Sequence, residues 1–169
     1  MPDISKNKRS SFATFLNVAP SATSPSWKRE GKGITSQTVN YNPSSDSEQY
    51  IDEDNATTTL NAYAPTMDGA MTTYKGDPVF DFVDGLRQAR AIGSDAETDL
   101  LMVYLYDFTE SQSVKTYKAE KQRVCIQIDD FGGEAGAALP INFTHNFMGD
   151  PVKGTVTITA GVPTFTADT

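Results

Sequence analysis

Apolar residues alternate with polar ones along much of the chain after residue 33, which is the pattern of half-buried β-strands. The run 99–108 (DLLMVYLYDF) is instead almost continuously apolar, so it predicts a strand that is covered on both faces. Alternation predicts the other strands, at 34–42, 56–66, within 114–133, at 138–149 and at 153–161. The pattern therefore indicates a mainly β fold.

One helix is predicted after the first of two copies of Gly-Asp-Pro-Val, at 76–79. Asp77 can cap the first free amides, and Pro78 suits the first helical position, where its missing N–H costs nothing. Apolar residues then recur at steps of three and four, and Gly93 stops the run. The prediction is an amphipathic helix over 78–91 whose inner face includes Val79, Phe82, Val83, Leu86 and Ala89 or Arg90.

The second copy, at 149–152, is followed by alternation rather than by helical spacing. It predicts a hairpin turn at Asp150 and Pro151 that leads into a strand. Nothing else around the two copies is alike, so an internal duplication is rejected. The prediction is a single β-rich domain over 34–169.

Residues 1–33 are rich in Ser, Pro, Asn and Lys and show no sustained periodicity, so they predict an irregular N-terminal arm. Phe12, Phe15, Leu16 and Trp27 are too apolar for a purely solvated tail. We expect parts of the arm to dock on the same fold or on a neighbouring molecule.

Composition and charge narrow the range of possible functions. The 169 residues hold 14 Lys and Arg against 22 Asp and Glu, a net charge of −8, which disfavours nucleic-acid binding. No apolar run has secretory or membrane-spanning length, so we expect a protein made in the cytoplasm. One cysteine, Cys125, allows neither an intramolecular disulfide nor a multi-cysteine metal site.

Little in the sequence indicates catalysis. The one histidine, His145, could act as a base only if a serine or Cys125 approached it, and no nucleophile motif accompanies it, so a structural or surface role is favoured. The glycines of 132–136 lack dinucleotide-binding spacing. We expect no enzyme activity, no cofactor and no metal.

Two charged segments stand out. The segment 43–58 predicts an exposed acidic loop or hairpin tip; a calcium site is the alternative, but the EF-hand order is missing. A basic cluster in 115–123 could face the acidic segment of a second copy and fix a head-to-tail arrangement, or be ordinary surface charge. The acidic residues are Asp46, Glu48, Asp52, Glu53 and Asp54, and the cluster is Lys115, Tyr117, Lys118, Lys121 and Arg123.

The order of these features resembles the major tail protein, or tail tube protein, of long non-contractile-tailed bacteriophages. The stretches that carry the resemblance are YIDEDNATTTLNAYAPTMDGAM, DPVFDFVDGLRQARAIG, LLMVYLYD and NFMGDPVKGTVTIT, within residues 34–160. The resemblance implies a β-sandwich or half-barrel flanked by one helix. It also implies six subunits to a ring, and stacked rings that form a hollow tube for DNA in the virion tail.

The resemblance gives the candidate residues roles. The segment 43–58 and the hairpin 108–123 would form contacts between subunits or rings, and the arm would join rings through Phe12, Phe15 and Trp27. The helix would pack on the sheet as core through Phe80, Phe82, Val83 and Leu86. Partners would be further copies, the tape-measure, tail terminator and distal tail proteins, and DNA that passes without specific binding, repelled by an acidic wall.

Other functions stay open on the sequence alone. A small β-sandwich module that binds carbohydrate or a host surface would account for the strands and aromatic residues. A small hydrolase that uses His145 and carboxylates is another hypothesis. The tubes of contractile tails and secretion systems share the general subunit fold, and the sequence does not exclude them.

Overall fold

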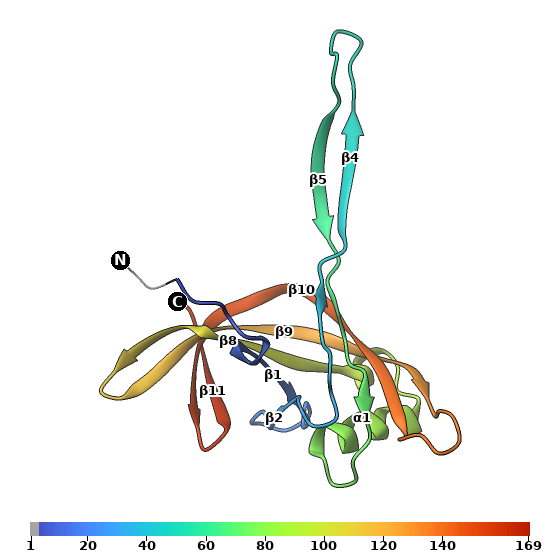
Figure 1. The fold of residues 1–169 in the computed structure, drawn as a ribbon, viewed down its shortest axis with the longest axis vertical. Coiled ribbons are helices and arrows are strands. Elements are labelled where there is room, and N and C mark those ends of the chain that lie inside the picture. Colours follow the sequence, from blue (N-terminus) through green and yellow to red (C-terminus); the bar gives the residue numbers. More distant parts are fainter. Residues whose placement is uncertain (1–3) are drawn as a thin grey trace.

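In the computed structural model, which describes residues 4–169, a large antiparallel sheet carries a helix on one face and a long hairpin that projects away from it (Figure 1). Within these residues there is one α-helix, α1 (Pro78–Ala89), and there are two 3-10 turns, η1 (Arg9–Ser11) and η2 (Gly93–Ala96). The strands are β1 (Phe12–Asn17), β2 (Trp27–Arg29), β3 (Val39–Asn40), β4 (Pro43–Glu48), β5 (Thr57–Tyr63), β6 (Thr66–Asp68), β7 (Met71–Thr72), β8 (Glu97–Ser111), β9 (Val114–Phe131), β10 (Pro140–Thr159) and β11 (Val162–Ala167).

Three long strands, β8, β9 and β10, form the spine of the sheet. The order is β2-β1-β8-β9-β10-β6-β3, with β7 and β11 also paired to β10, and β4 and β5 form a separate two-stranded sheet. The prediction of a mainly β fold with one flanking helix is confirmed.

The core consists of two clusters, one on each face of the sheet. Leu100 and Met102 of β8 point into the cluster that α1 covers, while Leu101 and Val103 belong to the cluster on the opposite face. All four side chains are buried, so the prediction that this strand is covered on both sides is confirmed.

Helix α1 begins where the sequence predicted. The carboxylate of Asp77 accepts hydrogen bonds from the backbone N–H groups of Val79 (2.9 Å) and Phe80 (3.0 Å), and Pro78 is the first helical residue. The helix ends at Ala89, two residues earlier than predicted, because Arg90 adopts a left-handed conformation (φ 49°) and caps it.

The inner face of α1 packs on the sheet. Val83 is fully buried in the cluster around Leu100, and Phe80, Phe82 and Leu86 are partly buried against the same cluster. The prediction that these four residues form core contacts is confirmed.

The prediction that residues 1–33 are irregular is wrong for two segments. β1 lies inside the sheet, paired with β8 from Leu100 to Tyr104, and β2 pairs with β1. Residues 13–17 are all buried, and their polar side chains are satisfied internally: Thr14 donates to Gln37, and Asn17 accepts from two backbone amides. A strand that is buried on both faces does not alternate, which explains why the pattern was missed.

The hairpin turn predicted at Asp150 and Pro151 is also wrong. These residues form a bulge within one 20-residue strand, β10, where Met148 pairs with Arg123 and Val152 with Lys121. Gly149 takes a positive φ of 68° at this bulge.

A buried side chain from the facing strand supports the bulge. Gln122 Nε2 donates to the carbonyl oxygens of Met148 (3.0 Å) and Gly149 (3.2 Å). Because these carbonyls find a partner inside the sheet, the strand resumes after Pro151 instead of reversing. A second irregularity lies in β8, where residues 105–107 interrupt the pairing with β9.

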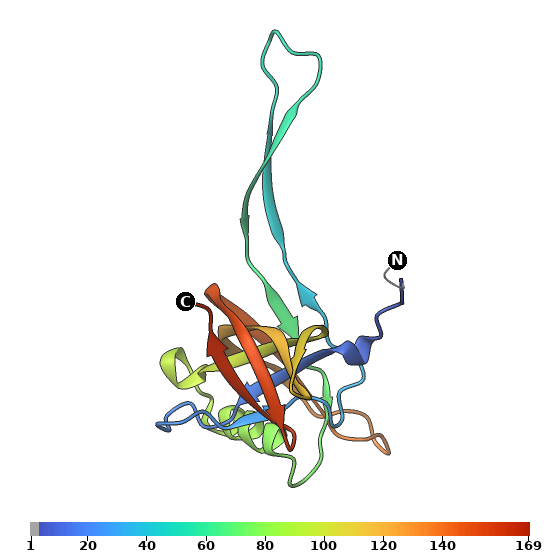
Figure 2. The same ribbon diagram turned by 90° about the vertical axis from the view of Figure 1, so that its left-hand side faces the viewer.

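The predicted acidic loop is the end of a two-stranded hairpin, formed by β4 and β5, that rises from the sheet (Figures 1 and 2). Every residue from 40 to 64 is exposed. The strand predicted at 56–66 corresponds to β5, whereas the strand predicted at 34–42 is reduced to the two residues of β3.

Two glycines of opposite environment offer a test of this packing. A methyl group added at Gly154 in β10 would overlap the carbonyl oxygen of Thr166 and the ring of Phe165, whereas one added at Gly85 in α1 meets nothing within 4 Å. We expect Gly154→Ala to lower the free energy of unfolding by about 1–3 kcal/mol. We expect Gly85→Ala to raise it by about 0.5–1 kcal/mol. Urea denaturation of both variants measures the difference, and equal effects would contradict the close approach of β11 to β10.

Candidate functional site

Within residues 4–169, no group of three or more His, Cys, Asp and Glu side chains is placed to hold a metal ion. A search of the same residues finds no helix of the length and hydropathy needed to cross a membrane. The features that remain are a buried polar network, the projecting hairpin and the open end of the sheet.

The buried network centres on His145. Its Nε2 lies 2.8 Å from Glu30 Oε1, and its Nδ1 lies 2.9 Å from the carbonyl oxygen of Met67. Gln37 donates to the second oxygen of Glu30 (2.9 Å) and accepts from the hydroxyl of Thr14 (2.9 Å). The side chains of His145 and Glu30 are both 0% exposed. With both ring nitrogens engaged and no access to solvent, His145 is placed to hold the structure together.

The protonation of this pair follows from its partners. A carbonyl oxygen can only accept, so Nδ1 of His145 carries a hydrogen, and the Glu30 carboxylate accepts the hydrogen on Nε2. Burial alone would lower the pKa of His145, but the charge and hydrogen bond of Glu30 and the bond to Met67 outweigh it and raise the pKa above 6.5. Burial alone would raise the pKa of Glu30, but the charge and hydrogen bond of His145 and the bond from Gln37 lower it below 4.5.

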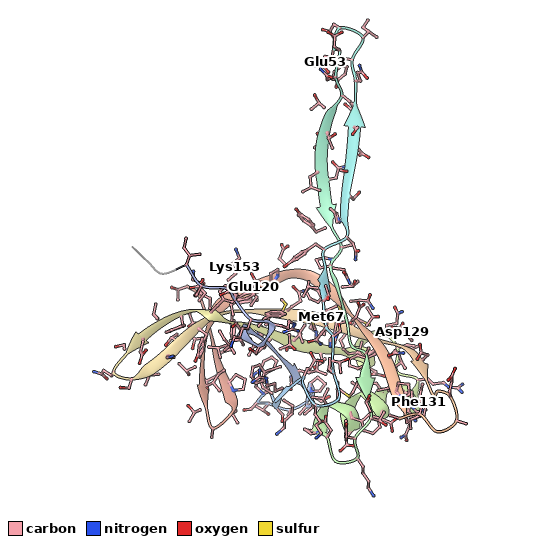
Figure 3. The ribbon with its side chains drawn as sticks, in the orientation of Figure 1. Glu53, Met67, Glu120, Asp129, Phe131 and Lys153 are labelled. Atoms are coloured by element: carbon pink, nitrogen blue, oxygen red, sulfur yellow. The ribbon has the colours of Figure 1, made fainter. Side chains whose placement is uncertain are left out.

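The network also fixes the base of the hairpin. Gln37 lies just before β3, which leads into the hairpin, and Met67 lies in β6, which follows it. β3 and β6 pair with each other, and β6 pairs with β10 next to His145. Figure 3 places Met67 in the body below the hairpin. The legs of the hairpin are therefore tied to the core through one buried ion pair.

The hairpin itself has the character of a binding element. Tyr50 is 60% and Ile51 108% exposed at its end, and Glu53 lies beside them at the far end of the structure (Figure 3). A two-stranded hairpin with no covered face is marginally stable by itself, and exposed apolar residues at the end of such a projection are typical of a contact surface. The five predicted acidic residues all lie on this hairpin, so here the structure brings the predicted group together.

The predicted basic cluster does not form a single patch. Lys115, Tyr117 and Lys121 lie on one face of β9 and Lys118 lies on the other, because neighbouring residues of a strand point to opposite faces. Several of these cations already have partners inside the chain. Arg123 pairs with Glu97 (3.2 Å) and Asp99 (3.4 Å), Lys118 with Asp107 (2.8 Å), and Lys115 and Lys121 lie over the rings of Phe108 and Phe165.

The proposed aromatic anchors are used inside the chain. Phe15 is 2% and Trp27 8% exposed, and both belong to the cluster around Leu101. Phe12 is half-buried and stacks on Tyr104, with 5.7 Å between the ring centroids. The expectation that Phe15 and Trp27 dock in a neighbouring subunit is therefore wrong, since their own core covers them.

Sequence reasoning missed the open end of the sheet. β1 pairs with β8 only as far as Tyr104, so residues 108–111 of β8 pair with β9 alone in the described part of the chain. On the other side, β11 pairs with β10 and with no further strand among residues 4–169. Four adjacent strands, β8, β9, β10 and β11, thus end in two unpaired edges. The signal available in the sequence was strand length, because β8, β9 and β10 continue beyond the apolar core residues.

Comparison with known proteins adds no identification, because no protein-family model matches the chain and no curated protein is significantly similar to it.

The buried pair predicts a pH dependence of stability. The raised pKa of His145 means that its contribution is complete below 6.5 and is lost as the pH rises through the folded-state pKa. The lowered pKa of Glu30 means that its contribution is complete above 4.5 and is lost as the pH falls through the folded-state pKa. We expect the pair to stabilise the fold most between pH 4.5 and 6.5.

Glu30→Gln tests this dependence. Removing one partner of a buried pair should cost about 3–5 kcal/mol at pH 5.5 and less at high pH, where His145 is neutral in the folded wild-type protein as well. Denaturation at several pH values measures the difference from wild type, with the exposed Asp95→Asn as the control. A constant difference across the pH range would contradict the assignment.

Proposed function

We propose that this chain is the subunit of a self-assembling tube of the kind built by tail tube proteins of long non-contractile-tailed bacteriophages. In this proposal it is a structural virion protein without catalytic activity. Its partners are copies of itself and the proteins that fill and close a tail: the tape-measure, tail terminator and distal tail proteins. DNA passes through the lumen without being bound specifically.

The observation that carries the proposal is the four-stranded end of the sheet with two unpaired edges. An unpaired strand edge presents free N–H and C=O groups, which is a hazard in a monomer and a means of association in an oligomer. The two edges lie on opposite sides of the same four strands, so the β8 edge of one copy can pair with the β11 edge of the next. Such head-to-tail pairing closes into a ring when the rotation between copies allows it, and the joined sheets then form one barrel.

The faces of this four-stranded end suggest which side faces the lumen. One face carries Val103, Ala119 and Val156 and is covered by the chain's own core. The other face is open and carries threonines in register across the strands: Thr109 pairs with Thr116, Thr116 with Thr157, and Thr157 with Thr164. We therefore assign the threonine face to the lumen.

This assignment changes how the wall of the lumen is expected to interact with DNA. The wall would combine hydroxyl groups with Lys118, held by Asp107, and with Glu120, which accepts a hydrogen bond from Tyr104, so it would not be a strongly acidic surface. Five carboxylates lie instead on the hairpin, which projects away from the body (Figure 1). DNA would pass mainly because the wall has few cations that could bind phosphates and release counterions. Repulsion of phosphates by the wall would contribute less.

Assembly gives the direct test. We expect the purified protein to form rings or tubes in negative-stain electron microscopy as its concentration rises. The double variant Thr109→Lys, Thr164→Lys places a charge on each exposed edge and should abolish rings, because lysine on an edge strand opposes edge pairing. Gln88→Lys, on the exposed side of α1, is the matched control and should assemble like wild type.

Two outcomes would contradict the proposal. Rings formed equally well by the double variant would exclude the strand edges as the contact. A wild-type protein that stays monomeric at every concentration, alone and with preformed tail ends as seeds, would favour the β-sandwich binding module instead.

A further inference from the structure

Charge is strongly segregated along the first third of the chain. Residues 43–63, the hairpin, hold five carboxylates and no Lys or Arg. Residues 4–42 hold one carboxylate, Glu30, which is buried against His145. The same segment holds six exposed cations: Lys6, Lys8, Arg9, Lys28, Arg29 and Lys32.

Neither set is neutralised inside the chain. The ion pairs among the described residues include none of these six cations and none of the five hairpin carboxylates. Arg9 and Lys32 lie over the rings of Phe12 and Tyr74, which leaves their charge exposed. Two hairpin carboxylates accept from neutral neighbours, Asp46 from Asn61 and Glu48 from Tyr50.

The hairpin cannot meet these cations within one molecule. Both views show it rising away from the body, with its end far from β1 and β2 (Figures 1 and 2). Ten residues on each leg, at roughly 3.3 Å per residue, give a reach of about 30 Å, comparable with the width of a small domain. A complementary surface that it can reach therefore lies in another molecule.

The basic segment also offers a place for the exposed apolar residues of the hairpin end. A hollow of about 290 Å³ lies between Arg9 and Arg29, and Phe12 and Ile34 contribute apolar surface to it. On the hairpin, Tyr50 and Ile51 are followed at once by Asp52, Glu53 and Asp54. The hairpin end and the hollow thus each combine apolar residues with charged ones, and their charges are of opposite sign. Specific protein interfaces have the same arrangement of an apolar centre and a complementary charged rim.

We propose that the end of the hairpin in one copy binds the hollow between Arg9 and Arg29 in another copy. The inference deepens the proposed function and rests on it, because it supplies the contact that joins one ring to the next. Each copy carries both halves of the contact, so the association is head-to-tail and open-ended. Because its rim is formed by exposed charges, we expect the contact to weaken as the salt concentration rises.

Two charge-reversal variants test the contact. The hairpin variant is Asp52→Lys, Glu53→Lys, Asp54→Lys, and the surface variant is Lys8→Glu, Arg29→Glu, Lys32→Glu. We expect each variant alone to associate at least about tenfold more weakly than wild type, because like charges then face each other. We expect an equal mixture of the two to recover association, because the reversed hairpin matches the reversed surface.

Sedimentation velocity at low ionic strength measures association for each protein alone and for the mixture. Circular dichroism and thermal melting check that the variants are folded. The matched control is Lys75→Glu, Arg90→Glu, Lys153→Glu, which reverses the same number of exposed cations outside the basic segment. The control should associate like wild type and should not rescue the hairpin variant.

The outcomes separate this contact from the tube proposal. A mixture that associates no better than either variant alone overturns the contact. If both variants still form stacked tubes, the contact fails while the tube function stands. If the mixture associates but no rings appear with any protein, the contact stands while the tube function fails.

Discussion

Strand β9 is hydrogen-bonded to β8 on one side and to β10 on the other along most of its length, and the rest of the molecule is built on this ladder. One face of the ladder carries the core that α1 covers, and the opposite face carries the cluster around Leu101. Because the ladder is longer than the elements that flank it, its far end is left with unpaired edges. The same backbone pairing that holds the fold together therefore creates the surface through which we propose that it assembles.

Buried polar side chains support two of the places where the chain departs from the regular ladder. At the bulge of β10, Gln122 supplies the hydrogen bonds that the facing backbone no longer provides. At the base of the hairpin, a histidine and a glutamate are buried together, and each makes the burial of the other acceptable. Buried polar groups thus lie at the bulge of β10 and at the base of the hairpin, where the chain leaves the regular sheet.

The sequence predicted those parts of the fold whose signals are local. Asp77 and Pro78 marked the start of the helix, and the apolar run after Asp99 marked a central strand, because a cap and a run need no knowledge of distant residues. β1 was missed because burial on both faces removes alternation. The second Gly-Asp-Pro-Val was misread because the choice between turn and bulge depends on Gln122, a residue of another strand.

The candidate site follows the same division. The acidic residues could be grouped from the sequence, since they lie close together on one hairpin. The basic residues could not be grouped in this way, because Lys118 lies on the opposite face of β9 from Lys115. Arg123, in turn, is paired with Glu97 and Asp99 of the neighbouring strand β8. Register is fixed by the packing of the whole sheet and is not written in the spacing of charges along one strand.

If the chain assembles as proposed, the fully exposed hairpin has a consequence for how assembly begins. A solvated two-stranded hairpin is marginally stable by itself. Ordering it against a neighbour costs conformational entropy, and this cost weakens each contact between two chains. Two free chains that meet gain one such contact, whereas a chain that joins a finished ring gains contacts with several neighbours at once. The first steps are then unfavourable and the later ones favourable, so free chains would persist at concentrations where an existing end still elongates. At such concentrations, the number and length of the polymers depend on the molecule that provides the first ring and on the molecule that caps the last one.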